Sequence, residues 1–210
     1  TRCIYGGRIS LSVGLVSVGI SLAIGIPLGC ISGFYGGAVD MVIQRFTEFL
    51  SCIPTFFLIL TVNAMVSSSI YNVMVIIGVF GWMGTCRQVR AQFLSLRQQE
   101  FVQAAYALGY TDAKVIFKHI LPNALVPVIV GATMGVAGAI MTESSLSYLG
   151  MGVQEPIPSW GAMLKVGQGF LRTSPRMAIL PGLFILVVAL SLNFVGDGLR
   201  DALDPRVTKG

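Results

Sequence analysis

The stretch EFVQAAYALGYTDAKVIFKHILPN, residues 100–123, is a polar segment that lies between two strongly apolar parts of the chain. Gly109 can adopt the left-handed backbone conformation that ends a helix, and Thr111 or Asp112 can cap a second helix after it. Pro122 then permits a turn into the next apolar stretch. The sequence therefore predicts two short helices at a defined angle, where a minimal loop would suffice to join the apolar parts.

The composition around this segment is that of a membrane protein. Hydrophobic residues make up 54% of the chain and charged residues only 11%, which is outside the range of ordinary soluble domains. About 20 helical residues cross a hydrocarbon layer of about 30 Å. We therefore predict an all-α membrane protein, with a single transmembrane domain over residues 1–210 and five spans. The spans lie near 9–34, 46–67, 70–86, 123–143 and 177–197.

The first span contains Pro27 and a series of glycines at four-residue intervals, Gly25, Gly29, Gly33 and Gly37. Small residues at this spacing leave a smooth helix face, so we interpret them as a packing surface for another helix.

Lysine and arginine predict the orientation, because cytoplasmic loops of membrane proteins carry an excess of them. If residues 87–122 are cytoplasmic, alternation places 35–45 and the C-terminal tail on the same side, and 144–176 outside. Nine of the 14 basic residues then lie inside, namely Arg45, Arg87, Arg90, Arg97, Lys114, Lys118, Arg200, Arg206 and Lys209, and five outside, Arg2, Arg8, Lys165, Arg172 and Arg176. The net charge of +5 thus reflects topology, and no nucleic-acid partner is expected.

The chain shows no catalytic machinery of its own. It contains no Ser-His-Asp set, glycine-rich phosphate loop or paired carboxylates in a recognisable pattern. Its four cysteines lack metal-ligand spacing and are expected to be buried small side chains rather than disulfides, and a single histidine excludes most histidine-based metal sites. We therefore expect a protein that is not an enzyme and holds no cofactor or metal.

Small residues within the quoted segment predict a docking surface. Ala104, Ala105, Leu108 and Gly109 are spaced to fall on one helical face, where a partner could approach the backbone closely. A structured helix pair between two spans suits the docking of another protein and the transmission of its movement.

The segment resembles the E-A-A loop in the permease subunits of binding-protein-dependent ABC importers. That loop reads E-A-A, three residues, G, nine residues, I-x-L-P, and the chain keeps this spacing with QAA at 103–105, Gly109 and HILP at 119–122. Glutamine replaces the first Glu and histidine the Ile. The peptide and nickel branch of the family is more similar, since it commonly places a Glu three residues earlier, here Glu100, and reads H-I-L-P-N.

Three further stretches resemble the second permease subunit of dipeptide and oligopeptide importers. They are YGGRISL at 5–11, ESSLSYLGMGVQEPIPSWGAML at 143–164 and GDGLRDALDPR at 196–206. The resemblance implies the transmembrane domain of a type I ABC importer, with a coupling segment near 95–122 and an external loop near 144–176. It also leads us to expect one more helix before Thr1, because the family subunit has six.

The resemblance implies a subunit that forms the translocation path for dipeptides or oligopeptides in a bacterial or archaeal cytoplasmic (inner) membrane. Its partners would be a second permease subunit, two ATPase subunits that bind ATP and Mg²⁺, and an external substrate-binding protein. Nickel and glutathione remain alternative substrates. A secondary transporter or a channel subunit is the alternative of a different class, although the five spans show no inverted repeat.

The ATPase-coupling positions implied by the resemblance are Glu100, Gln103, Ala104, Ala105, Gly109, Asp112, His119 and Pro122. For His119 we favour a packing role at the interface over a proton-linked role.

Two acidic residues lie within or near the apolar spans, where a carboxylate is costly unless it has a partner or faces a cavity. Glu48 follows Arg45 by one turn, which predicts a local ion pair. Glu143 lies beside Ser144 and Ser145 near the outer end of its span. This cluster could line the outer mouth of the translocation path. Alternatively, Glu143 caps the helix end or hydrogen-bonds within the external loop, and the sequence leaves both alternatives open.

The external segment 150–176 contains Pro156, Pro158 and Trp160 in an otherwise apolar stretch. We predict an interfacial helix or re-entrant segment that Trp160 anchors in the membrane interface and that helps to receive the binding protein.

The predicted orientation can be tested by cysteine labelling in a variant that lacks the native cysteines. A cysteine at Asp112 should react with a membrane-impermeant thiol reagent only from the cytoplasm, and one at Gln168 only from outside, because an odd number of spans separates them. The reverse pattern would contradict the orientation.

Overall fold

The computed structural model describes residues 1–66, 69–154 and 156–203, and every regular element in this part of the chain is a helix. Within these described residues, four helices are long and apolar enough to cross a membrane. They are α1 (Arg2–Tyr35), α4 (Ile70–Leu96), the continuous helix Asp112–Tyr148 that ends in α7 (Leu121–Tyr148), and α9 (Arg176–Leu203). Four predicted spans are thus confirmed with longer bounds. The loop predicted to begin at 144 begins only after Tyr148, because α7 continues to that residue.

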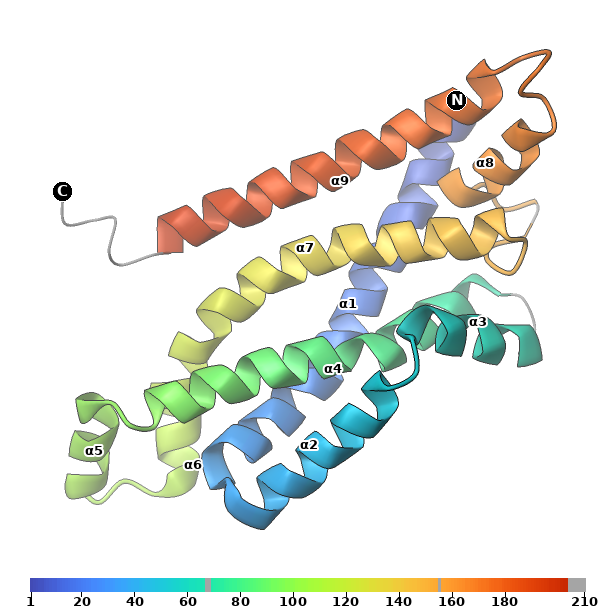
Figure 1. The fold of residues 1–210 in the computed structure, drawn as a ribbon. Helices are drawn as coiled ribbons and strands as arrows, with labels where there is room; N and C mark the ends of the chain where they lie inside the picture. Colours follow the sequence, from blue (N-terminus) through green and yellow to red (C-terminus); the bar gives the residue numbers. More distant parts are fainter. Residues whose placement is uncertain (67–68, 155, 204–210) are drawn as a thin grey trace.

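The predicted span 46–67 is not one straight helix. The chain forms α2 (Gly37–Ser51) and α3 (Thr55–Met65), whose axes differ by 77°, so that the pair is at most one bent span. Pro54 precedes α3 directly and explains the break. Proline lacks the N–H that would continue the helix, and it disfavours helical geometry in the residue before it. Figure 1 shows α2 and α3 turning away from each other beside α4.

The central contact of the fold is between α1 and α4, and α7 packs against both helices (Figure 1). The predicted glycine face of α1 makes this contact. A Cβ atom at Gly25, Gly29 or Gly33 would lie within 2.7 Å of α4 atoms. Gly37 does not belong to this face, because it begins α2 with a positive φ of 53°.

Polar contacts fix one end of this core, where α1 turns into α2. The Arg90 guanidinium of α4 donates two hydrogen bonds to the Asp40 carboxylate of α2, at 2.5 and 2.6 Å. Arg97 donates from the end of α4 to the Phe34 carbonyl at the end of α1, at 3.0 Å. These contacts hold the α1–α2 turn beside the end of α4, as the predicted alternation of spans requires.

The remaining predictions for this part of the chain concern an ion pair, the cysteines and the basic residues. Arg45 and Glu48 form the expected ion pair, with 3.0 Å between Nη1 and Oε2. All four cysteines are free thiols, but only Cys86 is buried; Cys3 and Cys30 are half-buried and Cys52 is exposed. Arg206 and Lys209, which entered the charge count, lie outside the described residues.

The α1–α4 contact predicts a strong difference between two glycines of the same helix. Gly29→Ala should lower the stability of the purified protein by about 1–3 kcal/mol, because the added methyl group would meet the Cys86 carbonyl oxygen at 2.7 Å and backbone atoms cannot rotate away. Gly19→Ala is the control, since no heavy atom lies within 4 Å of its added Cβ. Thermal unfolding midpoints in detergent would measure both, and equal midpoints would contradict the prediction.

Candidate functional site

The quoted segment forms a compact helical unit at the end of α4. It contains α5 (Glu100–Ala107), α6 (Asp112–Val115) and the π-helix η1 (Ile116–Ile120). In Figure 1, α5 and α6 lie at one end of the molecule and α8 (Trp160–Gln168) at the other. The predicted first short helix is confirmed. This unit therefore stands at the end of the molecule that the charge count assigns to the cytoplasm.

The second short helix does not end where it was predicted to end. α6 and η1 lead directly into α7, so Pro122 lies inside a continuous helix and the predicted turn at this residue is wrong. A proline ring in a helix clashes with the carbonyl group four residues earlier and removes one hydrogen bond. The π-helical turn directly before Pro122 widens the helix at this place, and in this way the chain accommodates the proline without a break.

The end of α5 is fixed by Gly109. This residue has φ of 77°, and its N–H donates to the Tyr106 carbonyl at 2.9 Å, while the Tyr110 N–H donates to the Ala105 carbonyl at 3.1 Å. The two bonds form a Schellman motif, in which a left-handed residue satisfies the last carbonyl groups of a helix. The predicted role of Gly109 as the helix stop is confirmed.

The predicted side-chain cap of the second helix is absent at Thr111. This residue occupies the N-cap position, but its side chain accepts no capping hydrogen bond. The Asp112 carboxylate instead accepts a hydrogen bond from the Tyr106 hydroxyl at 3.1 Å. Burial and this contact raise the pKa of Tyr106. Asp112 thus joins α6 to α5 across the intervening turn.

The small residues of α5 were predicted to share one face, but they do not. Val102 and Ala105 are buried in a cluster with Val89 and Phe93 of α4, whereas Ala104 is exposed. Successive helical residues point about 100° apart, so Ala104 and Ala105 cannot both face a partner. α5 is therefore anchored to α4 through one side.

The other side of α5 forms an open surface, which we call the α5 outer face. It combines one acidic residue, one glutamine and several small or apolar residues, all exposed: Glu100, Gln103, Ala104, Ala107, Leu108 and Gly109. Leu108 is 73% exposed. An exposed leucine next to small residues and a glycine offers a contact surface close to the helix backbone.

His119 lies in η1 and packs against Tyr110, which follows α5 in the chain. Its ring packs 5.6 Å from the Tyr110 ring, and its carbonyl accepts a hydrogen bond from the Asn123 amide at 2.7 Å. The Nε2 atom is buried and has no hydrogen-bond partner in the described part of the chain. These contacts agree with a packing role. Pro122 is exposed.

Glu143 lies at the opposite end of the core and is fully buried. Its carboxylate accepts hydrogen bonds from the hydroxyl groups of Ser10, Ser144 and Ser147, at 3.1, 3.4 and 2.7 Å. The Ser10 hydroxyl oxygen also accepts a hydrogen bond from the backbone N–H of Trp160 at 3.3 Å. The carboxylate thus joins α1, α7 and the start of α8, which favours the hydrogen-bonding alternative over an open path. Ser145 is exposed and donates to the Met141 carbonyl.

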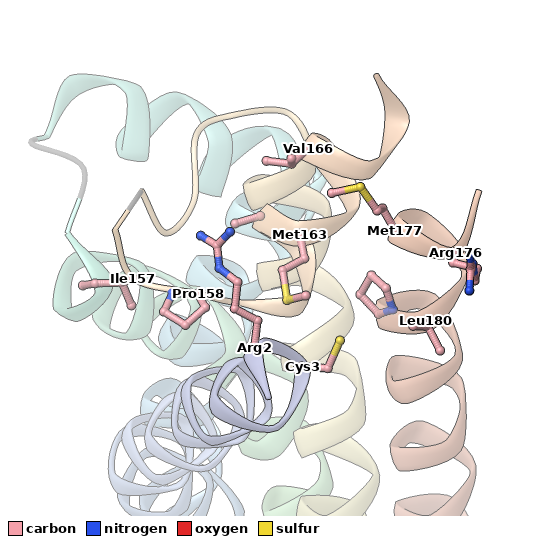
Figure 2. Close-up of a pocket in the computed structure, with 11 residues that line it drawn as sticks. Arg2, Cys3, Ile157, Pro158, Met163, Val166, Arg176, Met177 and Leu180 are labelled. Atoms are coloured by element: carbon pink, nitrogen blue, oxygen red, sulfur yellow. The ribbon is translucent and has the colours of Figure 1, made fainter. Parts of the chain in front are cut away.

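Trp160 was predicted to anchor the external segment in the membrane interface, but it does not. Its side chain is 2% exposed, its indole N–H donates to the Cys3 carbonyl at 2.9 Å, and its ring stacks on Phe184 of α9. Beside it lies a largely apolar hollow of about 220 Å³ between α1, α8 and α9 (Figure 2). The tryptophan is a core residue because the first turn of α1, α8 and α9 enclose it.

A half-open cavity of about 350 Å³ is lined by α1, α3, α4 and α7. We call it the membrane cavity. Its polar lining residues are uncharged, and several glycines keep it open. The polar residues are Ser17, Ser21, Thr55, Thr85, Gln88 and Thr142. These residues were not predicted from the sequence, although the pairs Ser17–Ser21 and Thr85–Gln88 are spaced to face one way on apolar helices.

The bundle, with its helix pair at one end, has the fold of the membrane-spanning subunit of a type I ABC importer. An inward-facing structure of the MetNI methionine ABC transporter superposes with a TM-score of 0.76 at 18% identity, covering 96% of this chain and 95% of that chain. An amino acid ABC transporter superposes with a TM-score of 0.72 at 14% identity, covering 96% and 94%.

The chain belongs to the family described as binding-protein-dependent transport system inner membrane component, which matches residues 25–209. It is 45% identical to the oligopeptide transport system permease protein OppC of Haemophilus influenzae over 98% of its length, 41% to the dipeptide permease DppC of Alkalihalophilus pseudofirmus over 99%, and 38% to the glutathione permease GsiD of Pectobacterium atrosepticum over 99%. It spans 66%, 68% and 69% of these relatives' lengths. This membership favours a permease over a secondary transporter or a channel.

The Glu143 contacts predict that two substitutions at this position differ in their effect on folding. Glu143→Leu should reduce the yield of folded protein strongly, because three buried serine hydroxyls would lose their acceptor, at about 1–3 kcal/mol for each unsatisfied group. Glu143→Gln should fold at nearly the wild-type yield, since its amide oxygen still accepts and serine hydroxyls can rotate to accept from its amide. Size-exclusion profiles in detergent would compare them. An equal yield of the Leu variant would contradict the structural role.

Proposed function

We propose that this chain is the permease subunit of an ATP-driven importer for short peptides, and that it couples the translocation path to separate ATPase subunits. The observation that carries the proposal is the arrangement of α5. One side of this helix is locked to α4 through Val102 and Ala105, and the other side, the α5 outer face, is open. A partner that moves α5 would therefore move α4 with it.

The proposed partners follow from this arrangement and from the family. A second permease subunit would complete the path, an ATPase subunit would bind the α5 outer face of each permease, and a binding protein would deliver substrate at the end that carries α8. ATP and Mg²⁺ would be held by the ATPase subunits. The chain itself would act as a transport subunit rather than an enzyme, in a bacterial or archaeal inner membrane.

Short peptides are the substrates best supported. Relatives at 45% and 41% identity are named oligopeptide and dipeptide permeases. The hydroxyl and amide groups of the membrane cavity can form hydrogen bonds with peptide groups, and their neutrality avoids holding a charged substrate tightly. Glutathione is the second candidate, because it is itself a peptide and a relative at 38% identity is named a glutathione permease.

The proposal predicts that Gly109→Leu abolishes coupling without preventing insertion. Leucine would be strained at the φ of 77°, and its side chain would project from the α5 outer face, since no atom of the chain lies within 4 Å of the added Cβ. ATPase subunits should copurify with the parent chain, and uptake of a labelled dipeptide should require ATP. Both should be lost in the leucine variant.

Gly109→Ala is the matched control, because it imposes the same backbone strain with little added bulk. It should retain more ATPase subunit than Gly109→Leu. Normal uptake by the leucine variant would contradict the coupling role, and a parent chain that binds no ATPase subunit would overturn the proposed function.

A further inference from the structure

Two cavities meet at one side chain of α4. The membrane cavity and a second cavity of about 410 Å³ are both lined by Gln88 of α4 and Gly131 of α7. The second cavity reaches Arg200 and Leu203 at the end of α9, and Pro127 near the start of α7. It therefore lies nearer to the end of the molecule that carries α5, and we call it the inner cavity. Gln88 stands at the junction of the two.

A hydrogen bond crosses this junction. The Gln88 side-chain amide donates from Nε2 to the Pro127 carbonyl oxygen at 2.8 Å, and so connects α4 to α7. Gly131 lies one turn further along α7 and leaves room for this amide. A Cβ atom at Gly131 would lie 2.8 Å from Oε1 and 3.2 Å from Nε2 of Gln88. Gln88, Pro127 and Gly131 together form what we call the Gln88 clasp.

The helix that the clasp holds is locally weakened. Pro127 lies inside α7 and has no N–H, so the carbonyl four residues earlier loses its helical hydrogen bond. A helix bends more readily at such a position. The clasp therefore joins α4 to the place where α7 can bend with the least loss of hydrogen bonding.

We propose that the Gln88 clasp closes the passage between the membrane cavity and the inner cavity, and that its release lets a substrate pass toward the cytoplasm. The inference rests on the proposed transport function and adds the residue that controls exit. A single neutral hydrogen bond is well suited to this role, because it can be broken and remade in each transport cycle. Its loss should shift the closed-to-open equilibrium by about fivefold, which corresponds to about 1 kcal/mol at 25 °C.

The test uses cysteine accessibility in the assembled complex. The native cysteines are replaced and a cysteine is placed at Thr85, which lines the membrane cavity but not the inner cavity. A membrane-impermeant maleimide is then added to the cytoplasmic face of inside-out vesicles. Gln88→Met should raise the labelling rate about fivefold, because methionine keeps the length of the side chain but cannot donate to Pro127.

Two controls accompany this variant. Gln154→Met removes the same kind of bond, a 2.8 Å donation from a glutamine amide to the Gly150 carbonyl, at an exposed site outside both cavities, and should leave labelling unchanged. A cysteine at Met134, which lines the inner cavity alone, should react equally in all variants.

Gly131→Ala gives an independent second perturbation, since its methyl group would displace the Gln88 amide. It should raise Thr85→Cys labelling as Gln88→Met does. Unchanged labelling in both clasp variants, in vesicles that still take up peptide, would overturn the clasp and leave the proposed function standing. Raised labelling in vesicles whose parent complex shows no ATP-dependent uptake would support the clasp and overturn the function.

Discussion

The close contact between α1 and α4 is the constraint on which the rest of the structure depends. Lipid chains are as apolar as the helices, so helices associate in a membrane through close packing rather than through the hydrophobic effect. Gly25, Gly29 and Gly33 provide this packing by letting the α4 backbone approach α1. Once the pair is formed, one side of α4 is available for α7 and the membrane cavity, and its end is available for α5.

Composition and local motifs predicted much of this fold, because their effects depend on residues that are close together in the sequence. Apolar length predicted the spans, and Gly109 predicted the end of α5, since the left-handed conformation depends on a single residue. Pro54 and Pro122 were harder to interpret. The same residue type breaks the chain before α3 but is absorbed by a π-helical turn before α7. Proline excludes a regular hydrogen bond at both places, and the surrounding packing decides whether the helix bends or widens.

Side-chain direction was the main limit on predicting the candidate site. Ala105 was assigned to a partner surface and Trp160 to the membrane interface, while two alternatives were left open for Glu143; all three are buried against other helices. Each side chain is covered by residues distant in sequence, such as Ser10 near Glu143 and Phe184 against Trp160. Burial of this kind depends on which helices meet, and no local pattern carries that information. Gln88 was missed for the same reason, since its importance comes from Pro127 on another helix.

The positions of α5 and the Gln88 clasp on α4 suggest how one could control the other. Val89 follows Gln88 directly and belongs to the same buried cluster as Val102 and Ala105 of α5. A close-packed cluster transmits displacement because its side chains have no free volume in which to move independently. A shift of α5 on a moving partner would thus reach the α4 turn that carries Gln88 without passing through any loop. The clasp, in turn, holds α7 near its own proline, so a small rotation of α4 is sufficient to separate the Gln88 amide from the Pro127 carbonyl. Coupling and exit would then depend on one helix, α4.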